Sequence, residues 1–187
     1  HDSLNLSGSG VGVCVLDSGA NVDVLNLSSA SVVGYNFVND STNFSDGHGH
    51  GTRVLHPLVE SAPDARYYVG KVLDDDGVGY SSDVAAGLDW CGSQGADIVS
   101  LSLGEGSYDG YCDDTLVASK VNELSDQGVL VVASSGNDGS STAVVNPSCA
   151  SGSLAVAAST KDDDLWINSN FNNATFLTAP GVDISTV

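Results

Sequence analysis

The stretch Val11-Gly12-Val13-Cys14-Val15-Leu16 decides the fold class. It is a continuous apolar run, rather than an alternation of apolar and polar residues. Such runs are typical of strands that are covered on both faces, as in parallel α/β sheets. Five further strand candidates follow along the chain, at residues 31–35, 67–73, 97–103, 128–133 and 154–158.

Helical patterns lie between these strands. Residues 83–91, which Ser81 or Ser82 can cap, predict one helix with a stripe formed by Val84, Leu88 and Cys91. Residues 113–125 predict a second helix, with an apolar stripe formed by Leu116, Val117, Val121 and Leu124. The alternation predicts an α/β fold with a doubly wound, mostly parallel sheet and helices on both faces. No repeat or linker stands out, so we expect a single domain over residues 1–187.

The charge balance is strongly acidic. Asp and Glu number 24 against 5 Lys and Arg, which gives a formal net charge of −19. Because apolar segments are plentiful, we expect these acids on a folded surface rather than in a disordered chain. The excess of acids and the scarcity of Lys favour adaptation to high salt. The lack of a basic patch argues against a nucleic-acid partner, and no apolar run is long enough to span a membrane.

The four cysteines form no CxxC pair, so a zinc site is not expected. Cys14 is interpreted as a buried strand residue. One pair among Cys91, Cys112 and Cys149 could be a disulfide, and the sequence leaves the pairing open. The Asp runs at 74–76 and 162–164 lack the spacing of a calcium loop, so no metal or cofactor is assigned, although calcium is not excluded.

Three segments that follow predicted strands carry candidate chemistry, because active sites of such sheets gather at the carboxyl ends of strands. They are Asp17-Ser18-Gly19, Asp46-Gly47-His48-Gly49-His50-Gly51-Thr52 and Ser135-Gly136-Asn137-Asp138-Gly139. Taken singly, the first and third are typical of turns. Asp46, His48 and His50 could suggest a metal-dependent hydrolase, but the ligand set is incomplete. The order of the three segments together is far more specific.

That order resembles the subtilisin-like serine proteases, whose triad runs Asp, His, Ser along the chain. Asp17 matches the family Asp, and His50 matches the family His in a D-x-x-G-H-G-T pattern. Asn137 matches the oxyanion-hole Asn in an S-G-N-x-G pattern. His48 is then a solvated loop residue. The likeness extends from about Gly10 to Ile184.

The resemblance implies roles for further residues. Gly77-Val78-Gly79 resembles the strand that pairs with substrate backbone, and Ser102-Leu103-Gly104 resembles the strand end that lines the primary specificity pocket. It also implies a peptide or protein substrate, secretion, and compatibility with an inhibitory prodomain.

Two departures from the family pattern stand out. No G-T-S-x-A segment, which holds the nucleophilic serine, occurs up to Val187. We therefore expect a fold that is incomplete at its C-terminus, with the serine outside this chain. The alternative is an inactive subtilisin-like module that binds peptides or protein partners. The second departure is Pro57, which we expect a helix to tolerate only in its first turn.

Overall fold

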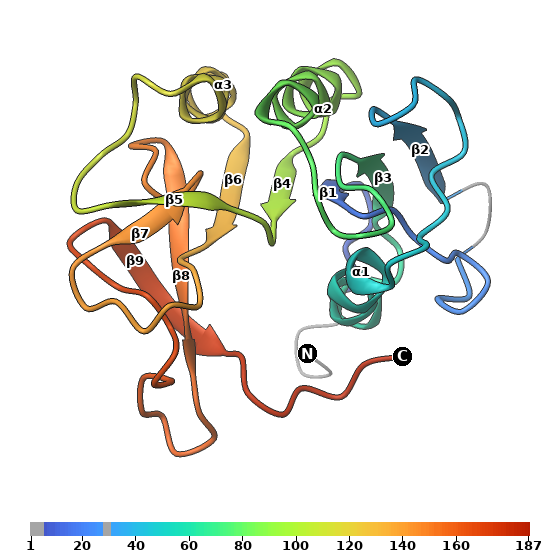
Figure 1. Cartoon of the computed structure of the whole chain (residues 1–187). Helices are drawn as coiled ribbons and strands as arrows, with labels where there is room; N and C mark the ends of the chain where they lie inside the picture. Colours follow the sequence, from blue (N-terminus) through green and yellow to red (C-terminus); the bar gives the residue numbers. More distant parts are fainter. Residues whose placement is uncertain (1–5, 28–30) are drawn as a thin grey trace. The chain divides into compact units, whose positions relative to one another are not determined.

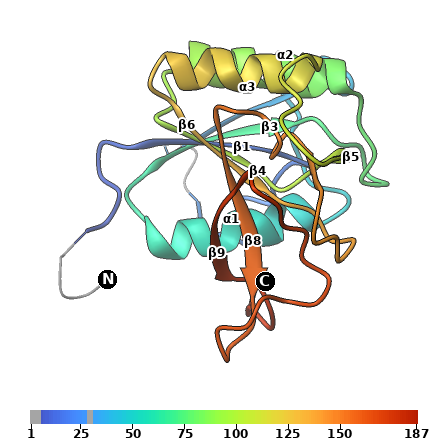
Figure 2. The same cartoon turned by 90° about the vertical axis from the view of Figure 1, so that its left-hand side faces the viewer.

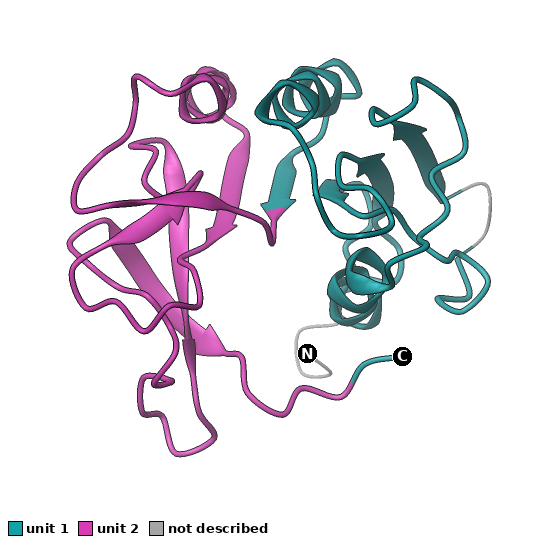
Figure 3. Cartoon of the chain, in the orientation of Figure 1, with its two compact units in different colours: residues 1–100, 186–187 teal, residues 101–185 magenta. Residues whose placement is uncertain are grey.

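The computed structural model describes residues 6–27 and 31–187. The chain divides into two compact units (Figure 3). The first comprises residues 1–100 and 186–187, and the second comprises residues 101–185. We describe each unit by itself.

The first unit is built on parallel strands in the order β2-β3-β1-β4 (Figure 1). In the register of β1 and β3, Asp17 lies opposite Lys71. β2 pairs with the other edge of β3, also in parallel. The strands span Gly12–Asp17 (β1), Val32–Asn36 (β2), Arg66–Lys71 (β3) and Ile98–Leu101 (β4, whose last residue is assigned to the second unit).

Two helices cover opposite faces of this sheet, α1 (His50–Ser61) and α2 (Ser81–Ser93) (Figures 1 and 2). The core that includes Leu55 of α1 also contains Val13, Val15, Tyr67 and Val69 of β1 and β3. Gly87 of α2 packs so closely on Leu16 and Val72 that a Cβ there would lie 3.0–3.1 Å from their side chains. Residues of β1 are therefore buried on both faces, as the continuous apolar run predicts.

The second unit contains the parallel strands β6, β8 and β9, in that order, and a separate antiparallel ribbon of β5 and β7. Helix α3 (Leu116–Asp126) packs on β6 and β8 through Val117, Ala118, Val121 and Leu124. The strands span Glu105–Tyr108 (β5), Leu130–Ser134 (β6), Val144–Asn146 (β7), Ser153–Ser159 (β8) and Thr175–Pro180 (β9).

All six predicted strands are present, and each of their ends is shifted by one or two residues. Strands β5, β7 and β9 were not predicted. β5 is the sequence Glu-Gly-Ser-Tyr, which carries no apolar run, and β7 has only three residues. Because such short strands are defined by their partners, local pattern does not reveal them.

The predicted helix details need four corrections. The second helix begins at Leu116 rather than at Asp113, and Thr115 is its N-cap. Ser81 and Ser82 lie inside α2, and its N-cap is Tyr80, which makes no side-chain cap bond. Leu116 is exposed, because the buried face of α3 is completed by Ala118. Pro57 lies in the interior of α1 rather than in its first turn. Proline removes a single intrahelical hydrogen bond, and the apolar packing of α1 through Leu55 outweighs that loss.

The structure contains two disulfides, Cys14–Cys91 and Cys112–Cys149. Cys14 is buried as expected, but the interpretation that placed it outside any disulfide is wrong. It lies in β1 directly beneath α2, which carries Cys91, and this adjacency is a tertiary feature. Disulfides of this kind persist in oxidising compartments.

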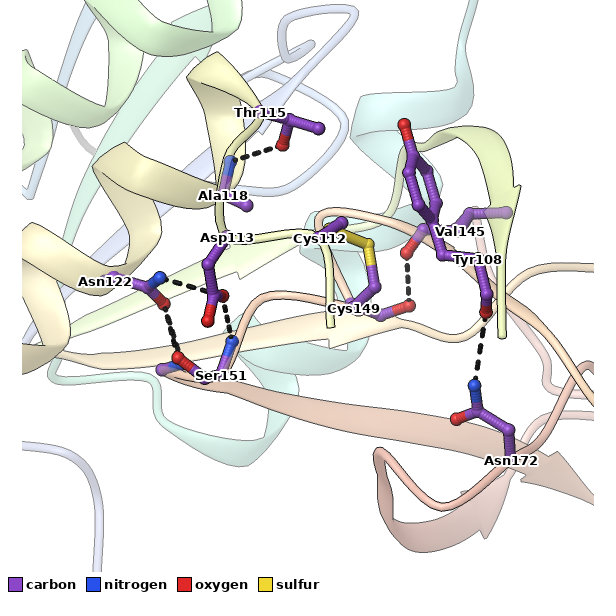
Figure 4. The surroundings of a disulfide bond; sticks show 12 residues. Tyr108, Cys112, Asp113, Thr115, Ala118, Asn122, Val145, Cys149, Ser151 and Asn172 are labelled. Carbon is purple, nitrogen blue, oxygen red and sulfur yellow. Dashed lines mark hydrogen bonds between the residues drawn. A yellow bond between two sulfur atoms is a disulfide. The ribbon is translucent and has the colours of Figure 1, made fainter. Parts of the chain in front are cut away.

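The second disulfide ties the loop before α3 to the loop before β8 (Figure 4). Cys112 N–H also donates to Cys149 O at 3.1 Å. Beside it, the Asp113 carboxylate accepts hydrogen bonds from Asn122 Nδ2 at 2.9 Å and Ser151 N at 2.8 Å. These bonds lower the pKa of Asp113.

No helix within residues 6–27 and 31–187 combines the length and apolarity that crossing a bilayer requires. In the same part of the chain, no three His, Cys, Asp or Glu side chains are grouped so that they could hold a metal ion.

Loss of the Cys112–Cys149 disulfide is expected to destabilise the protein. The bond joins residues 37 apart, and closing a loop of that length removes chain entropy worth about 4 kcal/mol from the unfolded state. The double variant Cys112→Ala/Cys149→Ala should therefore lower the free energy of unfolding by about that amount in denaturant titrations. Wild-type protein with both disulfides intact is the reference, and a loss below about 1 kcal/mol would contradict the prediction.

Candidate active site

Asp17 and His50 are brought together in the first unit. Asp17 is the last residue of β1 and is completely buried, and His50 is the first residue of α1. His50 Nδ1 lies 2.8 Å from Asp17 Oδ1. The same oxygen accepts a hydrogen bond from Ser18 N at 2.7 Å. The opposite edge of the imidazole is left for other partners, and the side chain keeps 37% of its surface exposed.

The electrostatics of this pair favour a charged imidazole. The hydrogen bond to Asp17 is the largest influence and raises the pKa of His50, and the Asp17 charge adds to it. Partial burial and the nearby Arg53 act in the opposite direction. Asp17 itself is satisfied on one side only, since its Oδ2 is buried and has no hydrogen-bond partner among the described residues. A histidine held in this way has a defined tautomer, with Nε2 able to accept a proton.

The close approach of α1 to β1 depends on Gly51. A Cβ at this position would lie 2.2 Å from Gly19 O and 3.2 Å from Asp17 Cβ. Only a residue without a side chain allows the first turn of the helix to rest on the turn that follows Asp17. The short His50–Asp17 distance therefore requires glycine at position 51.

Lys71 supports the same turn and was not found from the sequence. Its ammonium group donates to Ser18 O at 2.7 Å and to Asp75 Oδ1 at 2.8 Å. Lys71 is buried, and its place opposite Asp17 follows from the register of β1 and β3. No local pattern distinguishes it from a surface lysine, because its burial depends on that strand pairing.

Asp46, His48 and His50 do not form a metal site. The Asp46 carboxylate is occupied by N–H and O–H donors of its own loop, of α1 and of the turn after β1. His48 is exposed, as expected, and its ring lies 6.2 Å from that of His50 without sharing a ligand position.

Asn137 lies in the second unit, in the loop that follows β6, and is exposed. The buried Asn170 organises this loop, because its Oδ1 accepts hydrogen bonds from Asp138 N at 2.9 Å and Ser140 N at 3.0 Å. Gly136, with φ of 110°, brings the backbone against the Asn170 side chain. Sequence reasoning missed Asn170, which is separated from the loop by more than thirty residues.

The two expected substrate-binding segments lie in different units. In the first unit, Gly77 and Val78 are part of a turn that Asp74 N–H closes by donating to Val78 O at 2.8 Å, and Gly79 follows it. The segment is not part of a strand in the structure, and Val78 is exposed. In the second unit, Ser102-Leu103-Gly104 leads into β5, and Gly104 packs against Val145 of β7.

The chain belongs to the Subtilase family, whose model matches residues 8–187. Among similar proteins, Subtilisin BL of Lederbergia lenta is 35% identical over 189 residues, which cover 96% of this chain and 66% of that protein. Minor extracellular protease Epr of Bacillus subtilis (strain 168) is 33% identical, with 96% of this chain and 28% of that protein covered. The chain thus spans about two thirds of the length of the first relative and just over a quarter of the length of the second.

Solved structures agree with this assignment. A cold adapted subtilisin-like serine proteinase matches with a TM-score of 0.83 and 27% identity, covering 97% of this chain and 67% of that chain. A lanthipeptide protease matches with a TM-score of 0.84 and 26% identity, covering 96% and 58%. The predicted subtilisin-like α/β fold with a mostly parallel sheet is confirmed.

Gly51→Ala is expected to separate His50 from Asp17, because the added Cβ would overlap Gly19 O. The measurement is the Nδ1 proton resonance of His50 in an NMR spectrum, which should be lost or shifted toward that of a free imidazole. Gly110→Ala is the matched control, since nothing lies within 4 Å of a Cβ there. An unchanged His50 resonance in Gly51→Ala would contradict the role of this close approach.

Proposed function

We propose that this chain carries the acid–base machinery of a subtilisin-like serine endopeptidase, with the nucleophilic serine supplied from outside the chain. The observation that carries the proposal is the 2.8 Å contact between His50 Nδ1 and the completely buried Asp17. The family assignment supports it, as do relatives whose names identify them as proteases.

In the proposed mechanism, His50 is the general base and then the general acid. Its Nε2 takes the serine hydroxyl proton while the serine oxygen bonds to the scissile carbonyl carbon. The same proton passes to the leaving amine as the C–N bond breaks, which leaves an acyl-enzyme. Water then attacks the ester with His50 again as base, and a carboxylate product and free serine result. Asp17 stays ionised throughout, holds the imidazole tautomer and stabilises the imidazolium.

Asn137 is proposed to donate its side-chain amide to the oxyanion of the tetrahedral intermediate. Its exposure in a loop braced by Asn170 suits a donor that must meet substrate without moving. We propose that Gly77-Val78-Gly79 pairs with the substrate backbone and that Ser102-Leu103-Gly104 lines the primary specificity pocket. The substrates are then peptides or proteins.

The proposed setting is extracellular and saline. Two disulfides suit an oxidising compartment, and one relative is named as an extracellular protease. The ammonium nitrogen of each of the three lysines lies 2.8–3.7 Å from a carboxylate oxygen. The chain nevertheless retains a net charge of −19. The Debye length falls from about 10 Å at 0.1 M salt to about 3 Å at 1 M, so molar salt suppresses the repulsion among these acids.

The saline setting predicts that the free energy of unfolding rises as salt is added. Circular dichroism across a KCl titration should show a folded chain in molar salt and loss of helical signal at low ionic strength, because unscreened acids repel one another. Sucrose at equal osmolality is the control, since it does not screen charge. Full folding at low salt would remove the high-salt proposal.

The protease proposal predicts covalent labelling of a serine by a fluorophosphonate probe in the full-length protein in molar salt. His50→Ala should abolish labelling, because no other group takes the serine proton. Labelling should weaken as pH falls through the raised pKa of His50, since the protonated imidazole cannot act as a base.

The control for this experiment is His56→Ala, which alters a half-buried histidine elsewhere on α1. No labelling of the folded full-length protein would instead favour the inactive module that binds peptides or protein partners.

A further inference from the structure

The Asp46 carboxylate lies just before α1 and binds several donors at once. Its Oδ1 accepts hydrogen bonds from Ser18 Oγ at 2.9 Å and Gly49 N at 2.7 Å, with His48 N at 3.1 Å. Its Oδ2 accepts from Thr52 N at 2.8 Å and from Thr52 Oγ1 at 2.5 Å. One side chain thereby joins the loop before α1, the first turn of α1 and the turn after β1.

Ser18 connects this carboxylate to the Asp17–His50 pair. Its hydroxyl donates to Asp46 and accepts from Gly51 N at 2.9 Å. Its backbone N–H donates to the Asp17 oxygen that contacts His50. A continuous path of hydrogen bonds therefore runs from Asp46 through Ser18 to Asp17 on one side and to the residue after His50 on the other.

The N-cap residue of helix α1 makes no side-chain cap bond. Its N-cap is Gly49 in the left-handed conformation, which offers no side chain, and its first turn contains no acidic residue. In place of a conventional cap, Ser18 accepts the N–H group of Gly51 and Asp46 accepts that of Thr52. A negative charge at this end is also favourable to the helix dipole.

Asp46 is suited to stay ionised in this position. Burial acts to raise the pKa of its carboxyl, but the hydrogen bonds from Thr52, Gly49 and Ser18 outweigh burial and lower the pKa. The carboxylate is therefore charged at any pH at which His50 can serve as a base.

We propose that Asp46 is a positioning residue for His50: by closing the N-terminus of α1 and bracing Ser18, it holds the imidazole against Asp17. The inference deepens the proposed function and rests on it only for its kinetic consequence. The geometric part concerns the Asp17–His50 pair and is independent of the serine.

The charged groups that face His50 are few. Asp17 at the end of β1 and Asp46 in the preceding loop raise its pKa, and Arg53 on α1 lowers it. The exposed His48 ring lies 6.2 Å away. Removing the Asp46 charge should therefore lower the pKa of His50, and freeing the helix end should also weaken the Nδ1–Asp17 hydrogen bond.

The test uses this chain with labelled histidine, in molar salt, and compares Asp46→Asn with wild type by NMR. Asparagine has the same size, but it has one acceptor oxygen where the carboxylate has two. We expect His50 to titrate at lower pH and its Nδ1 proton resonance to shift or broaden. Asp76→Asn is the matched control, because it removes one exposed acidic charge of the same unit without touching this network.

A second variant, Ser18→Ala, keeps the Asp46 charge and removes only the hydroxyl. It should shift or broaden the Nδ1 proton resonance of His50 in the same way. If Asp46→Asn fails to fold, this variant still tests the proposal. A merely structural role would lower the free energy of unfolding of both variants and leave the His50 titration and Nδ1 resonance as in wild type. That result would overturn the proposal.

In the full-length protein, Asp46→Asn should lower kcat about tenfold to a hundredfold, in line with the cost of misplacing a catalytic base by about 1 Å, with KM nearly unchanged. Altered His50 signals in a protein that no fluorophosphonate labels would support the positioning role and remove the protease proposal. Wild-type kcat together with unaltered His50 signals would remove the positioning role and leave the protease proposal standing.

Discussion

The hydrogen bond between His50 and the completely buried Asp17 is the constraint on which the rest of the first unit depends. Burying a carboxylate is costly unless it is hydrogen-bonded, and among the residues that the structure describes Asp17 receives only the Ser18 N–H and the imidazole. The surrounding structure must therefore hold the His50 imidazole beside the Asp17 carboxylate. Gly51 permits the approach, Lys71 holds the turn through Ser18 O, and Asp46 closes the helix that carries His50.

In the second unit, a proposed functional residue is also held in place by hydrogen bonds, but the groups involved are neutral. Asn137 is exposed on a loop whose backbone N–H groups are bound by the buried Asn170 side chain. The Cys112–Cys149 disulfide ties the loop before α3 to the loop before β8 in the same unit. In both units a polar side chain remote in sequence holds a turn or loop that adjoins or carries a proposed functional residue. This arrangement leaves these segments little conformational freedom to lose on binding the proposed substrate.

The surface charge obeys a different constraint. A net charge of −19 on 187 residues stores repulsion that neither the core nor the disulfides can remove. The three lysines are placed beside carboxylates, and Lys71 is used inside the structure next to the proposed site. Salt is then part of the proposed folding environment, and the contact of His50 with the buried Asp17 is screened less than the exposed charges.

The sequence by itself determined the α/β class, six of the nine strands that the described residues form, and Asp17, His50 and Asn137 as candidates, because apolar runs and short motifs are local properties. Only the tertiary structure decided the pairing of Cys14 with Cys91, the burial of Lys71, the interior position of Pro57 and the contacts of Asn170. Each of these depends on which segments become neighbours. Strand pairing and helix packing set those neighbours, and no pattern within a single segment records them.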